Sequence, residues 1–200
     1  MKARRFDQKW PYSHGGLDLG YYLFQLLKDF PNLEHTAGIS IIAIGTPSEP
    51  GDALGPLVGD ILCRRFDKGI ILGTSLNPVD ATNLKQYVLD RQPAELRPLI
   101  IAVDAAQGHW SSLGRIIARP GSIWPALSRG ALLPPVGDIS ITGTVMVRGS
   151  KFSAHLAQSL FGSPRLWALR LAPIIAEAIA WAVERFAEQR RAAGASPRTD

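Results

Sequence analysis

The stretch that decides the fold is ISIIAI at 39–44, followed by the loop GTPSEPGD at 45–52 and the segment ALGPLVGDILCRRF at 53–66. A short, continuous apolar run rich in β-branched residues is typical of a buried parallel strand. The glycines and prolines of the loop end that strand, and the spacing of apolar residues after the loop predicts a helix. Strand, loop and helix in this order predict the start of an α/β domain.

Strands and helices are predicted to alternate along the rest of the chain. Apolar runs predict further strands at 69–73, 99–103, 113–118 and 139–147, and helical spacing predicts helices at 17–30, 53–66, 82–92, 152–162 and 165–190. We therefore expect an α/β fold with three αβα layers, phosphorylase/hydrolase-like, whose mixed sheet is mainly parallel and covered on both faces. A single domain at 17–190 is expected between an irregular lead-in at 1–16 and a disordered tail at 191–200.

The composition is that of a globular protein. Hydrophobic residues make up 46% and charged residues 20% of the 200 positions. Part of the net charge of +5 lies at the two ends, and basic and aromatic residues do not alternate as in a stacking platform, so we expect no specific nucleic-acid binding. The single cysteine, Cys63, cannot form an internal disulfide; it favours a reducing cytoplasm and is expected to be a buried structural thiol.

No membrane segment is expected. Residues 1–16 contain no apolar run of the kind found in signal peptides. The most apolar helix, predicted at 165–190, carries Arg170, Glu177 and Glu184, and these charges favour packing on a core over spanning a membrane. That helix could pack on its own core or on a second subunit, so the formation of a homo-oligomer stays an open alternative.

Two aspartates fall where neighbouring strands are expected to end. Asp52 lies in the loop after the first strand, and Asp104 directly follows the strand LIIAV at 99–103. Sites in open α/β sheets form beyond the carboxyl ends of the strands, so the two carboxylates would share one crevice if these strands are adjacent. Two close carboxylates do not both ionise easily, so one can polarise a peptide carbonyl as an acid while the other activates water.

Other roles for these aspartates stay open. Asp52 could cap the helix that begins near Ala53, and Asp104 could satisfy backbone groups in a tight turn. The pair could also hold a metal ion with a third ligand. His14, His35, His109 and His155 share no metal-ligand spacing, and we expect no resident metal or cofactor; His109 stays a candidate because it follows Asp104 by five residues on what is expected to be the same loop.

Several residues around the aspartates are candidates for substrate binding. Glycines 45, 51 and 55 would let the backbone approach a peptide, and the full candidate set is Gly45, Thr46, Gly51, Gly55, Asp80, Asn83 and His109. Asp80 is also a candidate cap for the helix at 82–92. Asp138 precedes a strand at the opposite end of the sheet, where a turn or cap role is expected.

Five segments together resemble one protein family. They are IGT at 44–46, GDALGPLVG at 51–59, the segment from NPV at 77–79 to Asn83 and Leu84, IAVDA at 101–105, and LPPVGDISITG at 133–143. In order and spacing they resemble the YyaC-type sporulation proteins, a domain of unknown function, over about residues 17–185. That family is related more distantly to the germination protease of spore formers, which degrades the small acid-soluble proteins that coat spore DNA. Hydrogenase-maturation endopeptidases share the same fold class.

The resemblance implies that Asp52 and Asp104 are the two functional acids of a sporulation or germination peptidase. Its substrate would be a protein or peptide, such as a small acid-soluble spore protein, in the cytoplasm of the forespore or spore core. Hydrogenase-maturation peptidases add a histidine as a third ligand to nickel, and His109 is the candidate here. The family usually has histidines where this chain has Asp80 and Ser140, which favours the alternative of a non-catalytic sporulation factor that binds a peptide or partner in the same crevice.

Overall fold

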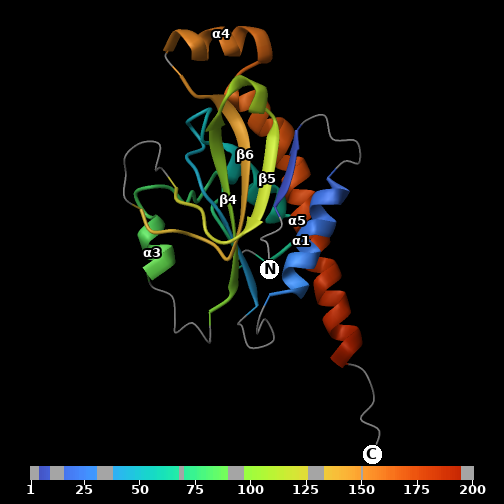
Figure 1. The fold of residues 1–200 in the computed structure, drawn as a ribbon. Coiled ribbons are helices and arrows are strands. Elements are labelled where there is room, and N and C mark those ends of the chain that lie inside the picture. The colour runs from blue at the N-terminus through green and yellow to red at the C-terminus, as the bar shows by residue number, and fades with distance from the viewer. Residues whose placement is uncertain are drawn as a thin grey trace, which may run out of the picture.

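One six-stranded sheet forms the centre of the molecule (Figure 1). The computed structural model describes residues 5–9, 16–30, 38–67, 70–89, 97–125, 133–149 and 151–194. The strands follow the order β1-β5-β6-β4-β2-β3, and their bounds are β1 (Phe6–Lys9), β2 (Ile39–Ala43), β3 (Ile71–Leu72), β4 (Leu99–Gly108), β5 (Arg115–Pro120) and β6 (Ile139–Val147). Strands β6, β4, β2 and β3 are parallel, and β5 and β1 extend the sheet antiparallel. The predicted mixed, mainly parallel sheet is confirmed.

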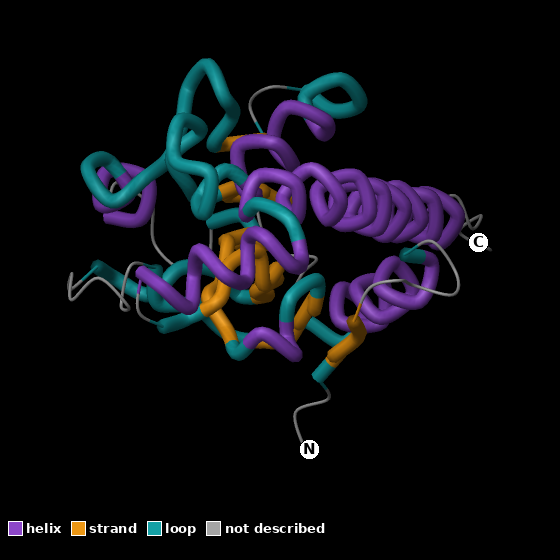
Figure 2. The backbone as a smooth tube through the Cα atoms, turned by 90° about the horizontal axis from the view of Figure 1, so that it is seen from above, coloured by secondary structure: helices purple, strands orange, loops and turns teal. Residues whose placement is uncertain are grey.

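Three helices cover one face of the sheet: α1 (Leu17–Lys28), α2 (Leu54–Leu62) and α5 (Pro164–Gly194). Successive side chains of a strand point to opposite faces, so Leu99, Ile101 and Val103 of β4 all belong to the core beneath these helices. Viewed from above, the longest helix, which leads toward the C-terminus, runs along one side of the strands (Figure 2). This face holds the larger of the two apolar cores, and we call it the packed face.

The opposite face carries a smaller core. Ile100 and Ala102 of β4 point to this side, together with Ile42 of β2. The short helix α3 (Leu84–Leu89) covers it through Leu84, and the segment that follows β5 contributes Ile123. The third layer of the expected fold is therefore one short helix and irregular chain. We call this side the pocket face, because it also lines the cavity described below.

The remaining helices lie at the carboxyl end of β4 and β6. The 3-10 helix η2 (Trp110–Ser112) follows β4, and α4 (Lys151–Phe161) follows β6 and joins it to α5 (Figure 1). Trp110 and Phe161 stack with ring centroids 6.1 Å apart, which ties these two elements together.

Among the boundaries that differ from the sequence prediction, four change the fold most. The lead-in at 1–16 is not irregular throughout, because Phe6–Lys9 form β1 and pair with β5. Strand β4 continues to Gly108 instead of ending at Val103, since β6 provides a hydrogen-bonding partner along that length. Helix α2 ends at Leu62, short of residue 66, and α5 continues to Gly194, into the segment predicted to be disordered. Residues 195–200 of that segment lie outside the described residues.

Helix α5 is also long and apolar enough to cross a membrane, judged by length and composition. An 18-residue window within Pro164–Ala192 has a mean hydropathy of 1.6, and 61% of that window is buried inside the molecule. Ala168, Leu171 and Ile175 are buried against the rest of the core. The burial accounts for the apolar composition, because the core helix of a folded domain meets the same criteria.

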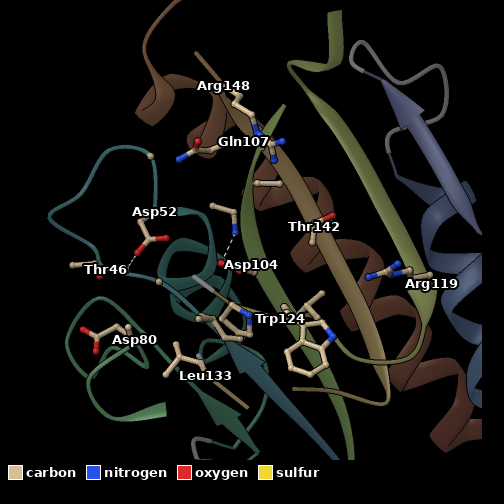
Figure 3. Close-up of a pocket in the computed structure, with 18 residues that line it drawn as sticks. Thr46, Asp52, Asp80, Asp104, Gln107, Arg119, Trp124, Leu133, Thr142 and Arg148 are labelled. Atoms are coloured by element: carbon tan, nitrogen blue, oxygen red, sulfur yellow. Dashed lines mark hydrogen bonds between the residues drawn. The ribbon is translucent and has the colours of Figure 1, made fainter. Parts of the chain in front are cut away.

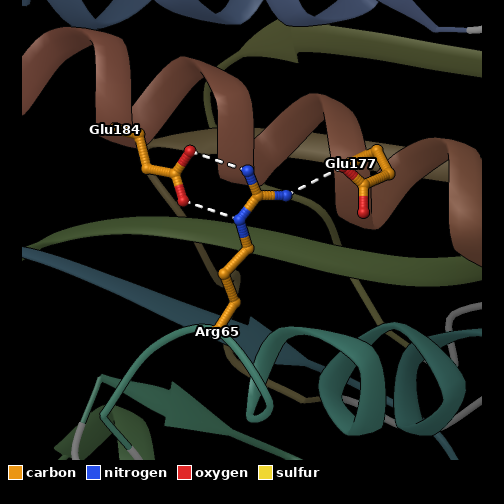
Figure 4. A network of polar contacts seen from close by, with 3 residues as sticks. All are labelled: Arg65, Glu177 and Glu184. Carbon is orange, nitrogen blue, oxygen red and sulfur yellow. Dashed lines mark hydrogen bonds and ion pairs between the residues drawn. The ribbon is translucent and has the colours of Figure 1, made fainter.

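Polar contacts hold the ends of these elements. Arg65, just after α2, donates two hydrogen bonds to Glu184 (2.6 and 2.8 Å) and one to Glu177 (2.8 Å), both on α5 (Figure 4). These hydrogen bonds, with Glu184 contributing most, raise the pKa of Arg65 above its ordinary value. At the amino end of β6, Asp138 accepts two hydrogen bonds from Arg97 (2.6 and 2.8 Å) and one from the backbone N–H of Ile100 (2.9 Å). The structural role predicted for Asp138 is confirmed.

Candidate active site

A pocket of about 770 Å³ opens at the carboxyl ends of β2 and β4 and extends along the pocket face (Figure 3). Its wall combines three carboxylates, two guanidinium groups and a few apolar side chains. The lining residues are Ile44, Gly45, Thr46, Gly51, Asp52, Asp80, Ala81, Asp104, Ala105, Ala106, Gln107, Arg119, Ile123, Trp124, Pro125, Leu133, Thr142 and Arg148.

Asp52 is held by the loop that follows β2. Its Oδ2 accepts a hydrogen bond from the backbone N–H of Thr46 (3.0 Å), and its own N–H donates to the carbonyl of Glu49 (2.9 Å). The loop closes tightly because Gly45, with φ at +148°, has no side chain: a Cβ there would collide with the carbonyl oxygen of Asp52. The sequence signal Gly-x₆-Asp thus shapes a loop that fixes one carboxylate.

Asp104 lies inside β4, and not directly after the strand as predicted. It is paired with Thr142 of β6, and it shares the pocket face with Ala102 because side chains alternate along the strand. Its Oδ1 accepts a hydrogen bond from the backbone N–H of Ala105 (2.8 Å). The carboxylate is therefore oriented by the strand itself.

The structure brings the two aspartates to the same pocket. Strands β2 and β4 are parallel neighbours, with Ala43 of β2 opposite Val103 of β4. Asp52 follows β2 by one loop and Asp104 directly follows Val103, so both carboxylates reach the same end of the sheet (Figure 3). The sequence left open that Asp52 caps α2. In the structure the N-cap position is occupied by Ala53, which makes no side-chain cap hydrogen bond.

Four of the seven predicted substrate-binding residues line the pocket: Gly45, Thr46, Gly51 and Asp80. Asp80 also has the predicted capping role, since its Oδ1 accepts hydrogen bonds from the backbone N–H (2.8 Å) and the hydroxyl (2.6 Å) of Thr82. One carboxylate oxygen of Asp80 thus secures the turn before α3.

The other three predicted residues lie away from the pocket lining. A Cβ on Gly55 would collide with the carbonyl oxygen of Ile44, so this glycine lets α2 approach β2 and serves packing. Asn83 accepts a hydrogen bond from the N–H of Asp80 (3.0 Å) and donates one to the carbonyl of Pro78 (2.9 Å), which makes it part of a turn.

His109 is the N-cap residue of η2, after the end of β4, so it does not share a loop with Asp104. Its Nδ1 lies 2.9 Å from the hydroxyl of Ser111, and its ring lies against Trp110. Within the described ranges no histidine lines the pocket, and no group of three or more His, Cys, Asp or Glu side chains is placed to hold a metal ion. His14 and His35 fall outside the described residues. The nickel-peptidase arrangement therefore has no third ligand from His109.

Several pocket residues were missed by the sequence analysis. Gln107 enters the pocket where the β4–β6 register shifts between Ala106 and Gln107, and such bulges re-aim side chains. Arg119 lies at the end of β5, one residue beyond the predicted strand, and Arg148 follows β6. Trp124, which also lines the pocket, is 58% exposed. The signal available in the sequence is a tryptophan in a Gly- and Pro-containing segment, between Gly121 and Pro125.

Cys63 is half-buried at the C-cap of α2 and packs against the large core. It lies outside the pocket lining.

The fold and the pocket define an α/β protein with an acid-lined cavity at the carboxyl ends of parallel strands. Residues 19–178 match a family described as a protein of unknown function, DUF1256, and the chain belongs to this family. It is similar to the uncharacterized protein YyaC of Bacillus subtilis (strain 168), with 37% identity over 121 residues. That match spans 59% of this chain and 59% of the relative. The resemblance of the sequence motifs to YyaC-type proteins of unknown function is confirmed.

Proposed function

We propose that this protein is a peptidase that hydrolyses a protein substrate during sporulation or germination, with Asp52 and Asp104 as its catalytic acids. The observation that carries the proposal is that both carboxylates line one pocket, at the ends of two adjacent parallel strands. A cavity of about 770 Å³ has room for several peptide residues.

The hydrogen bonds at the two aspartates suit a division of roles. One oxygen of each carboxylate accepts a backbone N–H, which fixes its orientation. In the proposed reaction the ionised carboxylate takes a proton from water, whose oxygen attacks the peptide carbonyl carbon. The protonated partner donates to the carbonyl oxygen. As the C–N bond breaks, the proton taken from water passes to the leaving amine, and one hydroxyl of the tetrahedral intermediate returns a proton to the partner. Either aspartate fits either role.

A second function is favoured by the same hydrogen bonds. If the two carboxylates serve mainly to order their own backbone, the pocket acts as a binding site for a peptide or partner protein, without hydrolysis. The described pocket lining contains no histidine to assist acid–base chemistry. This non-catalytic sporulation factor is the alternative that the experiment must separate from a peptidase.

The test is degradation of purified small acid-soluble spore proteins, the substrate class that we propose, located in the forespore or spore core. Wild type is compared with Asp52→Asn, Asp104→Asn and the control Asp67→Asn, whose side chain is exposed and outside the pocket. Asparagine retains an oxygen that accepts the same backbone N–H, so the fold is expected to persist. We expect both pocket variants to lose about a hundredfold or more in rate and the control to lose nothing.

Two results would contradict the peptidase. Cleavage that survives in both pocket variants would remove the aspartates from catalysis. No cleavage by the wild type, with binding of the same spore proteins in a pull-down that depends on the pocket, would favour the binding function.

A further inference from the structure

The pocket contains two guanidinium groups that the catalytic proposal does not use. Arg119 and Arg148 line the same cavity as Asp52, Asp80 and Asp104 (Figure 3). Among the described residues neither arginine makes an ion pair or a side-chain hydrogen bond, although three carboxylates share the cavity with them. The positive and negative groups of the pocket are therefore held apart.

Arginines on neighbouring elements behave differently. Arg115, on the same strand as Arg119, pairs with Asp7 at 2.7 Å. Arg97, near the start of β4, pairs with Asp138 at 2.6 Å. A guanidinium offers five donors in a planar fork that matches a carboxylate. The pocket arginines thus carry unused donors that face the space where a substrate would lie.

The strand register places the two arginines on opposite sides of Asp104. Asp104 is paired with Thr142 of β6, and Arg119 is paired with Ser140, two residues before Thr142. Arg148 follows β6, six residues after Thr142, and its N–H is anchored to the carbonyl of Gly108 (2.7 Å). At about 3.3 Å per residue, positions 140 and 148 are separated by roughly 25 Å, the length of a short extended peptide.

We propose that Arg119 and Arg148 form two subsites for acidic side chains of a peptide bound across the acid pair. This inference deepens the proposed function and rests on the peptide-binding pocket that it assumes. The aspartates repel negative charge from the centre of the pocket, while the two arginines attract it at the flanks. Trp124 and Leu133, which line the same pocket, add apolar surface for the stem of such a side chain. The preferred ligand is an extended peptide with acidic residues on either side of an uncharged centre.

A binding experiment tests this without requiring hydrolysis. Full-length Asp104→Asn protein is immobilised and exposed to a random dodecapeptide library, and the retained peptides are sequenced. We expect Asp and Glu to be enriched about fivefold per arginine subsite over the input library. The enrichment should vanish when Arg119→Gln and Arg148→Gln are added. The matched control adds Arg64→Gln and Arg191→Gln, two exposed arginines outside the pocket with the same change in net charge, and should keep the enrichment.

The outcomes separate this inference from the proposed peptidase. Acidic enrichment that depends on Arg119 and Arg148 supports the subsites even if the protein hydrolyses nothing. Retained peptides without acidic enrichment, equal enrichment in the pocket and control variants, or no retention at all would overturn the subsites. In each of these cases, cleavage lost in Asp52→Asn and Asp104→Asn would still support the peptidase.

Discussion

The two faces of the sheet differ in what they contribute: the packed face holds most of the core, and the pocket face lines the cavity. The packed face lies under α1, α2 and α5, and its side chains are almost entirely buried, including Ile101 and Leu171 at 0% exposure. The pocket face is covered by α3 and irregular chain, and it keeps a cavity lined by charged groups. Successive residues of a single strand, β4, contribute to the core and to the pocket: Val103 belongs to the large core and Asp104 lines the pocket.

This comparison indicates where mutations should act. Substitutions on the packed face should lower the free energy of unfolding, because interiors are close-packed and adjust poorly to lost volume. Substitutions on the pocket face should change binding or hydrolysis at little cost in stability.

The largest effect is expected for Leu171→Ala in α5. A Cβ built on Gly143 of β6 would lie only 3.1 Å from Leu171 Cδ1, so the leucine packs tightly on the sheet. Removing its buried methyl groups should lower the free energy of unfolding by about 2–5 kcal/mol. The matched variant is Leu133→Ala on the pocket face, where the leucine is only partly buried, and the expected loss is below about 1.5 kcal/mol.

Urea unfolding followed by circular dichroism measures both values. Similar losses for the two leucines would break the division between the faces, since the pocket face would then contribute as much to stability as the packed face. A loss of peptide retention in Leu133→Ala without a loss of stability would support the division, since the pocket face would then serve binding and not stability.

The intermediate effect is expected for Asp138→Ala, at the amino end of β6. The substitution leaves the Arg97 guanidinium without its carboxylate and the N–H of Ile100 without its acceptor. Arg97 is 35% exposed, so water screens part of the loss, and we expect about 1–3 kcal/mol. The control Asp67→Ala removes an exposed carboxylate and should change stability by less than about 0.5 kcal/mol.

Asp138 does not line the pocket, so any hydrolysis of spore proteins should be retained in folded Asp138→Ala. Activity lost in Asp138→Ala protein that is still folded would mean that the pocket depends on this ion pair at the amino end of β6.

The order of strands and helices was predictable because the signal is local. Apolar runs such as ISIIAI and LIIAV identify buried strands without knowledge of their neighbours. The meeting of Asp52 and Asp104 was also predictable, because the carboxyl ends of adjacent parallel strands lie at one edge. Both inferences depend on rules that hold for α/β sheets in general.

Features set by pairing partners were not predictable. Residues 104–108 (DAAQG) continue β4 only because β6 offers a partner over that length, and Phe6–Lys9 become a strand only against β5. Gln107 reaches the pocket through a register shift that the local sequence pattern does not predict. Arg119 and Arg148 come from strands far apart in the chain from Asp52, so their place in the pocket depends on the strand order.

The smallest effect is expected for Arg65→Gln, on the surface of the packed face. Arg65 makes three hydrogen bonds to Glu177 and Glu184, but all three side chains are 39–63% exposed. Exposed ion pairs are screened by water, so we expect a loss of at most about 1 kcal/mol in the free energy of unfolding. Arg64→Gln is the control, because the neighbouring arginine is exposed and makes no ion pair within the described part of the chain.

Salt distinguishes this contribution from that of the apolar core. Raising ionic strength to about 1 M shortens the screening length to about 3 Å, so the difference between Arg65→Gln and wild type should shrink. The loss in Leu171→Ala should persist under the same conditions, because apolar burial does not depend on charge. A loss in Arg65→Gln that equals the leucine loss and resists salt would mean that α5 is held to α2 chiefly by this ion-pair network and not by the core beneath it.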